Sequence, residues 1–496
     1  VSLVNVGIDV QFPGDGAPQL SLRMVGAQVN INQSIYQNFY LPVETSRGLN
    51  DHEGHVHVGD FTATLSPGTS LTFMASTEPG AQLDDQALNR RLQRDDQLLQ
   101  DWQQQKPAGT APTPAWINQL ALTADQFIVK RHSANNAETK SVIAGYHWFE
   151  DWGRDTMISL PGLTLATGRH QDAAAILATF AEFIDQGMLP NRFPDAGEEP
   201  QYNTVDATLW YFQAIRSYYE TTQDKDLLAK LLPKLTDIID WHLKGTRYGI
   251  KVDPTDNLLR GGEAGVQLTW MDAKVNDQVI TPRIGKPVEV NALWYNALKA
   301  TAYFARELGQ DATKYDQLAA ATQAGFNRFW NEQKGFCFDV LDGPQGNEEH
   351  LRPNQLFAIS LPEPLLSKEQ QKTIVDTCSA ALLTSNGLRT LATNDSDYKG
   401  AYGGDQYHRD SAYHQGTVWA WLLGPFVKAH LRVYQDTEAA FRYLAPLEDH
   451  LLSAGLGTIS EIFTGDAPFT PKGCISQAWS VAQVLETYQL LTSTKQ

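Results

Sequence analysis

The sequence predicts a mainly α-helical protein, an (α/α)6 barrel that follows part of a β-sandwich. Two observations lead to this fold class. Apolar and polar residues alternate over residues 1–80, as they do in half-buried strands, whereas apolar residues recur at helical spacing from about residue 116 onward. In addition, a polar or aromatic segment runs into an apolar helical segment about six times in the second region.

The alternating region contains the segments LVNVGIDVQF, LSLRMVGAQVNI, GHVHVGDFTATLS and TSLTFMAST. Gly, Pro, Asn and Asp, which favour turns, lie between these segments. The pattern predicts the antiparallel strands of a β-sandwich accessory domain over residues 1–80. Because the chain starts at Val1, without Met and already in strand-like alternation, we expect this first domain to be incomplete.

Residues 81–115 connect the two regions. The segment LDDQALNRRLQRDDQLLQDWQQQ is charged and rich in Gln, which predicts a solvent-exposed linker helix. The segment KPAGTAPTPAW, which follows it, has the Pro, Gly and Ala content of a connector. We therefore place the domain boundary there and assign residues 116–496 to one helical domain.

About every second helix of this domain follows a chemically dense loop. The intervals between loops, roughly 50–85 residues, have room for two helices each, so six helical hairpins can close into a double ring. The loops would then meet at one end, where helix N-termini present free N–H groups to a polar ligand. An open α-solenoid, the alternative, would not need such loops at every second turn. The loops begin near residues 149, 202, 286, 352, 413 and 474.

Composition restricts the partners and the compartment. The formal net charge is −18, with 42% hydrophobic and 19% charged residues, so the chain is globular and unsuited to nucleic acid or to anionic membranes. No apolar run reaches the length of a membrane span. Cys337, Cys378 and Cys474 form neither a CxxC pair nor a disulfide framework, which favours the cytoplasm. A neutral ligand fits this composition best.

Carboxylates are the groups left for catalysis. The chain lacks metal-spaced Cys/His clusters and the GxSxG, phosphate-loop and GxGxxG motifs, so we expect neither a metal nor an organic cofactor. Aromatic residues, 10% of the chain, often adjoin polar residues, as in sugar-binding clefts, where paired carboxylates cleave glycosidic bonds. Each acid could instead be solvated or ion-paired. The loops carry Glu150, Asp151, Asp155, Asp206, Asp272, Glu289, Asp410 and Glu461.

Two of these acids differ from the others. Asp272 lies in LTWMDAK, where aromatic surface would desolvate its carboxyl, raise its pKa and favour a protonated acid at neutral pH. Glu461 lies in TISEIFTGD, outside any strong helical pattern, where a loop can hold it against a water. Asp272 and Glu461 are therefore the strongest candidates for a catalytic pair.

Six segments, in their order along the chain, resemble motifs of bacterial and archaeal glycogen debranching enzymes. The resemblance is to the amylo-α-1,6-glucosidase domain of that family, which is similar to glucoamylases, and it covers roughly residues 116–490. It implies an (α/α)6 barrel and an inverting hydrolysis that releases single glucose units from α-1,6 branch points of an α-glucan. The segments are GYHWFEDWGRDTMISLPGLTL, QYNTVDATLWY, LTWMDAK, GKPVEVNALWYNAL, RDSAYHQGTVWAWLLGPF and SEIFTGDAPFTPKGCISQAWSVAQVLE.

The resemblance also implies roles for single residues. Asp272 matches the general acid and Glu461 the general base, whereas Arg154 and Asp155 match residues that hold the hydroxyls of the terminal glucose. Residues 1–80 resemble the end of the longer N-terminal β-domain of the family. No α-amylase-type barrel is present to support a 4-α-glucanotransferase activity. Small departures, such as Ile462 where Leu is usual, affect no implied role.

Further residues of the loops are predicted to contact the sugar. The tryptophans among them are stacking candidates, and core packing is the alternative for each. Asp410 is interpreted as an ion-pair partner of Arg409, with a second base as the alternative, and the lone His408 as a hydrogen-bonding residue of the ligand site or the core. The predicted contacts are Trp148, Asp151, Trp152, Asn203, Asp206, Trp270, Glu289, Asn291, His414, Gln415, Trp419 and Trp479.

Other functions stay open at this point. A glucoamylase or a trehalase has the same kind of fold, and cleavage of panose or limit dextrin, against maltose and trehalose, separates these activities. A catalytically silent glucan-binding protein would release no glucose. An α-solenoid interaction protein would scatter its loops over a surface.

Overall fold

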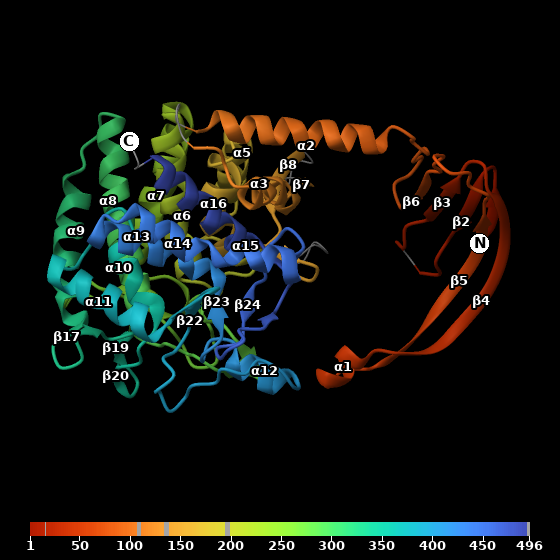
Figure 1. Cartoon of the computed structure of the whole chain (residues 1–496). Coiled ribbons are helices and arrows are strands. Elements are labelled where there is room, and N and C mark those ends of the chain that lie inside the picture. Colours follow the sequence, from red (N-terminus) through yellow and green to blue (C-terminus); the bar gives the residue numbers. More distant parts are fainter. Residues whose placement is uncertain (15, 107–110, 133–137, 194–198, 494–496) are drawn as a thin grey trace. The chain divides into compact units, whose positions relative to one another are not determined.

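The structure, a computed structural model, describes residues 1–14, 16–106, 111–132, 138–193 and 199–493. It is mainly helical after an N-terminal region of antiparallel strands (Figure 1). Among the described residues, no helix has both the length and the apolar character that crossing a membrane requires.

The chain divides into two units, and α2 contains the boundary. The first unit is formed by Val1–Gln97 with Gly403–Gln406, and the second by Leu98–Tyr402 with Tyr407–Gln496. The helix α2 spans Ala87–Gln104.

The described residues of the first unit form the sheet β1-β2-β3-β6 and the hairpin β4-β5, all antiparallel. Alternation buries Ile8 and Val10 on β2, as expected for a strand with one covered face. A β-sandwich stays a prediction. The elements are β1 (Ser2–Val4), β2 (Gly7–Val10), β3 (Leu20–Met24), β4 (Gln28–Tyr40), α1 (Pro42–Ser46), β5 (His52–Thr62) and β6 (Phe73–Ser76).

In the second unit, the helices that follow the chemically dense loops pack against one another in chain order. α4 contacts α6, α6 contacts α8, α8 contacts α10, α10 contacts α13, α13 contacts α16, and α16 contacts α4. Apolar residues lie on most sides of these helices, which is why they fill the core. Their bounds are α4 (Gly153–Leu160), α6 (Asp206–Thr222), α8 (Val288–Glu307), α10 (Phe357–Ser360), α13 (Leu423–Tyr434) and α16 (Ala478–Ser493).

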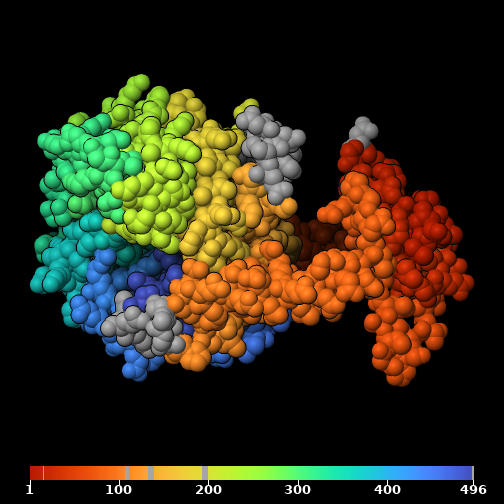
Figure 2. Space-filling model, turned by 90° about the horizontal axis from the view of Figure 1, so that it is seen from above, coloured from red at the N-terminus to blue at the C-terminus, as the bar shows by residue number. Residues whose placement is uncertain are grey.

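Other helices of this unit pack against the six core helices. α3 contacts α16, α5 contacts α6, α7 and α9 contact α8, and α11 and α14 contact α13. The yellow, green and blue segments of this unit pack into one continuous body (Figure 2). Bounds are α3 (Ala115–Phe127), α5 (His170–Glu182), α7 (Lys225–Lys244), α9 (Thr313–Phe326), α11 (Lys368–Ala381), α12 (Gln406–Ala412), α14 (Thr437–Leu444) and α15 (Pro446–His450).

Short helices of 3-10 or π type extend several of these helices or stand in the loops. They are η1 (Pro161–Leu165), η2 (Arg247–Gly249), η3 (Asn327–Phe329), η4 (Pro353–Leu356), η5 (Ala420–Leu422) and η6 (Leu451–Gly455).

Short strands fix the loops at the ends of the core helices. β23 pairs with β24 so that Trp419 lies opposite Ile462, the neighbour of Glu461. β26 pairs with β9, which places Gln477 opposite Gly145. Backbone pairing therefore joins loops that are far apart in the sequence. The strands are β7 (Ile128–His132), β8 (Glu138–Val142), β9 (Gly145–Tyr146), β10 (Asp151–Trp152), β11 (Arg192–Phe193), β12 (Lys251–Val252), β13 (Leu259–Arg260), β14 (Lys274–Val275), β15 (Gln278–Val279), β16 (Lys286–Pro287), β17 (Trp330–Asn331), β18 (Phe336–Cys337), β19 (Val340–Gly343), β20 (Gly346–Glu348), β21 (Leu383–Thr384), β22 (Gly387–Arg389), β23 (Val418–Trp419), β24 (Ile462–Phe463), β25 (Pro471–Lys472) and β26 (Ser476–Gln477).

Candidate active site

Arg154, in the first turn of α4, joins two of the predicted carboxylates. Its buried guanidinium donates from Nε to Asp206 Oδ1 at 2.8 Å and from Nη1 to Asp272 Oδ2 at 3.0 Å. Thr204 donates to the same Asp206 oxygen at 2.9 Å. Asp206 is the first residue of α6, where the helix dipole favours a negative charge. Arg154 therefore shares its charge between Asp206 and Asp272.

Asp272 lies in the loop between β13 and β14, and its side chain is 25% exposed. Burial raises the pKa of Asp272 above the ordinary value, Arg154 lowers it, and Asp206 raises it again. The net direction is upward, because burial has the largest effect and the Arg154 charge is shared. The carboxyl is thus biased toward its protonated form.

Glu461, which precedes β24, is held through both of its oxygens. The Tyr413 hydroxyl donates to Oε1, and the Cys474 backbone N–H donates to Oε2 at 2.8 Å. Burial raises the pKa of Glu461 to about 7, although these two hydrogen bonds act in the opposite direction. The carboxyl of Glu461 therefore titrates near neutral pH with a fixed orientation.

Both acids line one pocket, which we call the Asp272–Glu461 pocket. Its walls combine carboxyl groups with the flat faces of aromatic rings, the surface that a sugar needs for hydroxyl bonding and for stacking. Two carboxyls with raised pKa values across such a pocket suit acid–base cleavage of a glycosidic bond. The lining is Phe149, Trp152, Arg154, Asp155, Trp270, Asp272, Tyr413, Trp419, Glu461, Gln477 and Trp479.

Asp155 contributes a third carboxyl to this pocket. It lies in the first turn of α4, and Gln477 Nε2 donates to its Oδ1 at 3.2 Å. The Cys474 thiol donates to Gln477 Oε1 at 2.8 Å and so fixes which way the amide faces. Burial raises the pKa of Asp155 to about 8, against the charge of Arg154.

Tryptophan rings form the apolar walls and are locked by contacts with each other. Trp270 lies edge-on to Trp419, with ring centroids 5.5 Å apart, and Trp419 lies 5.6 Å from Trp479. Trp270 Nε1 donates to Asn354 Oδ1 at 2.8 Å, and Trp419 Nε1 donates to the Tyr413 carbonyl at 2.9 Å. The rings are therefore held in place before any ligand binds.

The pocket contains Asp272, Glu461, Trp152, Arg154, Asp155, Trp270, Trp419 and Trp479 from the predicted set, and other predicted residues lie outside its lining. Trp148 is 46% exposed, and His414 is fully buried and stacks on Trp419 at 5.1 Å. Arg131 binds both oxygens of Asp151. The remaining predicted residues outside the lining are Asn203, Asp206, Glu289, Asn291 and Gln415.

The side chains of Glu289 and Asn291 have structural partners at the start of α8. Arg283 donates to both oxygens of Glu289. Asn291 accepts from the Leu259 N–H at 2.7 Å and donates to the Leu259 carbonyl at 3.0 Å. These bonds anchor α8 to the neighbouring loop, so both residues hold the start of this helix without lining the pocket.

Phe149, Tyr413 and Gln477 line the pocket but were not predicted to contact a ligand. Each lies within or next to a loop that leads into a core helix. Phe149 precedes Glu150, Tyr413 precedes His414, and Gln477 precedes the first residue of α16. What the sequence lacked was a sign that a Tyr hydroxyl and a Gln amide would bond to Glu461 and Asp155.

Two families of known sequences match the chain. Residues 122–486 match the family described as Amylo-alpha-1,6-glucosidase, and residues 7–72 match the family described as Glycogen debranching enzyme N terminal. The glycogen debranching enzyme of Saccharomyces cerevisiae is 24% identical over 417 residues, which cover 63% of this chain. The matched part spans 27% of the yeast protein's length.

Solved structures from Thermus thermophilus have a similar fold. An uncharacterized conserved protein has a TM-score of 0.53 at 15% identity and covers 74% of this chain and 99% of its own. The GH63 mannosylglycerate hydrolase, in complex with Tris and D-glycerate, has a TM-score of 0.55 at 12% identity and covers 75% and 99%. The sequence matches extend over most of the helical unit and part of the strand unit, so this chain belongs to the glycogen debranching enzyme family and carries its amylo-alpha-1,6-glucosidase domain.

Proposed function

We propose that the protein is an inverting amylo-α-1,6-glucosidase that releases glucose from the α-1,6 branch points of a glycogen-like α-glucan. The observation that carries this proposal is the joint presence of Asp272 and Glu461 in one pocket walled by tryptophans, in a chain of this family. The closed order of contacts among the core helices supports an (α/α)6 barrel, with the pocket at the end where the dense loops meet.

In this mechanism Asp272 is the general acid and Glu461 the general base. Asp272 gives its proton to the glycosidic oxygen as the bond from that oxygen to C1 of the glucose breaks. Glu461 takes a proton from a water, whose oxygen bonds to C1 from the opposite face, so α-linked glucose leaves as the β-anomer. Room for this water requires the two carboxyls to lie roughly 6.5–9.5 Å apart.

Arg154, Asp155 and Gln477 are proposed to hold the terminal glucose. Arg154 keeps Asp272 in place through the 3.0 Å bond to its carboxylate. Asp155 and the Gln477 amide, joined at 3.2 Å, present an acceptor and a donor to sugar hydroxyls. Trp152, Trp270, Trp419 and Trp479 offer rings for the apolar faces of the sugar. No step of this mechanism draws on a metal or an organic cofactor.

The substrate assignment is tested by glucose release from four sugars. Panose and a branched limit dextrin are expected to yield glucose at a rate well above that from maltose or trehalose. Faster release from maltose would favour a glucoamylase, and faster release from trehalose would favour a trehalase. Absence of glucose from all four would leave a silent glucan-binding protein.

Replacing Tyr413 by Phe is expected to move the acidic limb of the kcat/KM profile to higher pH. The Tyr413 hydrogen bond lowers the pKa of Glu461, so its loss raises that pKa above about 7. A general base works ionised, so activity is present above its pKa and is lost as the pH falls through it. Tyr398→Phe, which loses a bond to Asp466 instead, is the control and should leave the limb in place. If the acidic limb of the Tyr413→Phe profile stayed at the wild-type pH, the role of Glu461 as the base would be contradicted.

Replacing Gly473 by Ala is expected to lower kcat by about 10- to 100-fold, because small displacements of a reacting group have effects of this size. Gly473 has φ +68°, and a Cβ built there would overlap the Glu461 carboxyl. Gly309 has the same φ of +68° with open space around its Cβ position, so Gly309→Ala imposes similar backbone strain away from the pocket. Equal kcat values for the two variants would show that Gly473 does not position Glu461.

A further inference from the structure

A cavity of about 560 Å³ lies in the second unit and shares no lining residue with the Asp272–Glu461 pocket. Small-molecule sites have volumes of roughly 300–1,000 Å³, so this cavity has the size of a binding site. Its walls are Ile280–Ile284, Pro344–His350, Arg352, Asp397 and Gln415. We call it the Glu348 cavity.

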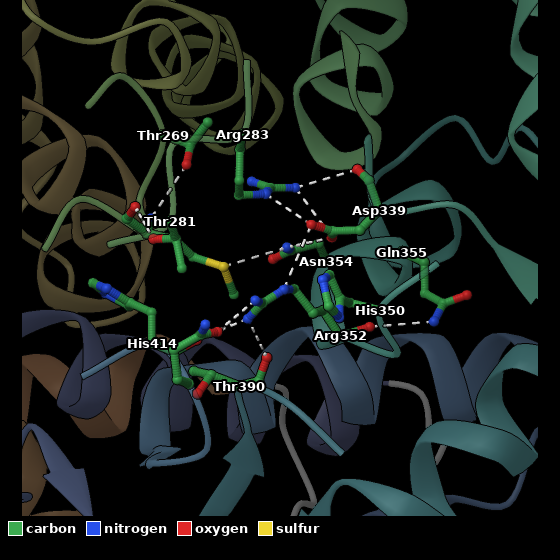
Figure 3. Close-up of polar contacts among 12 residues, drawn as sticks. Thr269, Thr281, Arg283, Asp339, His350, Arg352, Asn354, Gln355, Thr390 and His414 are labelled. Atoms are coloured by element: carbon green, nitrogen blue, oxygen red, sulfur yellow. Dashed lines mark hydrogen bonds and ion pairs between the residues drawn. The ribbon is translucent and has the colours of Figure 1, made fainter. Parts of the chain in front are cut away.

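The arginines of this cavity are already neutralised by carboxylates behind its wall. Arg283 is buried, and it donates to Asp339 Oδ2 at 2.8 Å and to Glu289 Oε2 at 2.7 Å (Figure 3 shows the Asp339 pair). Arg352 is buried as well, and its Nε lies 3.7 Å from the same Asp339 oxygen. Two arginines thus face two carboxylates, and these four side chains together carry no formal net charge that would attract an anion.

Other polar groups of the cavity have unused bonding capacity. Within the part of the chain that the structure describes, the half-buried Glu348 carboxylate accepts no hydrogen bond, and burial raises its pKa. His350 uses Nδ1 for Asp395 Oδ2 at 2.7 Å, and Gln415 uses Oε1 for Arg352 Nη2 at 2.5 Å. Among the same described residues, neither His350 Nε2 nor Gln415 Nε2 has a partner. The cavity therefore presents carboxylate acceptors, Glu348 among them, together with neutral N–H or ring-nitrogen groups.

This combination favours a neutral, hydroxyl-rich ligand. An anion would meet the carboxylates of Glu348 and Asp397. A cation would lie near Arg283 and Arg352, which act on Glu348 electrostatically. Sugar hydroxyls both donate and accept, so they can satisfy a carboxylate and an amide at once, and Pro282 and Ile284 supply apolar surface for the ring.

We propose that the Glu348 cavity is an accessory site for a short α-1,4-linked glucan segment, separate from the pocket that cleaves the branch. The polar groups of the cavity account for the binding of a polyol in general, whereas the choice of an α-glucan rests on the proposed function. Glu348 and Gln415 are the residues that bond its hydroxyls.

Wall residues of the Glu348 cavity contact the loop that carries Asp272 and the loop that carries Tyr413, the hydrogen-bond partner of Glu461. Thr281, a wall residue, donates to the Met271 carbonyl at 2.7 Å, next to Asp272. Arg352 donates to the His414 carbonyl at 2.7 Å, next to Tyr413 (Figure 3). A glucan segment bound here thus lies next to these two loops, where it can hold a branched substrate close to the pocket.

The test is a calorimetric titration of the full chain with maltotriose while saturating 1-deoxynojirimycin, a glucose mimic, fills the Asp272–Glu461 pocket. The expected result is binding of one maltotriose per chain. Glu348→Ala should weaken this binding about tenfold or more, as expected for loss of a hydrogen bond to a charged group. Glu438→Ala is the matched control, because Glu438 is exposed on α14 and its side chain is 82% accessible.

Three results would overturn the proposal. They are no maltotriose binding once the first pocket is filled, equal binding by wild type and Glu348→Ala, and preferential binding of citrate or putrescine. If Glu348→Ala does not fold, a crystal of the wild-type chain soaked in maltotriose decides, because density between Glu348 and Gln415 supports the site and its absence contradicts it. A chain that releases no glucose from α-1,6 substrates but binds maltotriose here refutes the proposed function alone.

Discussion

Asp272→Asn is expected to lower kcat for a branched α-1,6 glucan by about 10³-fold, which corresponds to about 4 kcal/mol of transition-state stabilisation. Asparagine keeps the shape of the side chain and can still accept the Arg154 N–H that now binds Asp272 Oδ2 at 3.0 Å. It cannot give a proton to the glycosidic oxygen. Steady-state glucose release from limit dextrin measures the loss, and the thermal midpoint checks that the variant folds.

A substrate whose leaving group needs no proton distinguishes a general acid from a residue that only shapes the pocket. Fluoride leaves without a proton, so Asp272→Asn should hydrolyse α-glucosyl fluoride with a rate near that of the wild type. Asp277→Asn provides the control, since Asp277 is fully exposed in the same loop region. If Asp272→Asn lost both activities equally, Asp272 would not be the acid.

Glu461→Gln is expected to lower kcat about 10³-fold for the glucan and for α-glucosyl fluoride alike, because both reactions need an activated water. The amide can keep both contacts, because its oxygen can accept from the Cys474 N–H while its NH2 group donates to the Tyr413 hydroxyl oxygen. The rates are measured with both substrates. Glu448→Gln, which changes an exposed residue, is the control.

An added anion provides the decisive check on the general base. Azide needs no deprotonation, so it should restore turnover of α-glucosyl fluoride by Glu461→Gln and give β-glucosyl azide. Full activity of Glu461→Gln without azide would assign the base to another residue, and Asp155 is the remaining carboxyl of the pocket lining.

Periodicity in the sequence was sufficient for the coarse fold. The change from alternation to helical spacing predicted a strand region followed by a helical region, and the structure confirms both. The loops predicted to lead into helices do precede α4, α6, α8 and α16, because polar residues at the N-termini of apolar helices leave a clear pattern. Strands of only two residues, such as β23 and β24, are too short to show an alternating pattern. Their pairing therefore could not be predicted.

The sequence likewise predicted some residues of the candidate site and not the contacts between them. Asp272 and Glu461 were proposed from their surroundings in the sequence, and their roles and those of Arg154 and Asp155 from motifs that resemble those of one family, which the sequence matches confirm. The partners of Glu289 could not be found this way, since Arg283 reaches it through a loop whose path depends on tertiary packing. The Tyr413 bond to Glu461 likewise joins residues that are distant in sequence.

The central proposal, inverting cleavage of an α-1,6 branch by this pocket, is tested most directly by proton NMR of the first glucose released from a branched limit dextrin. The C1 proton reports the anomer before mutarotation. Early accumulation of β-glucose, with loss of α-1,6 linkages, is the predicted result. Early α-glucose, or glucose released with the α-1,6 linkages intact, would contradict it.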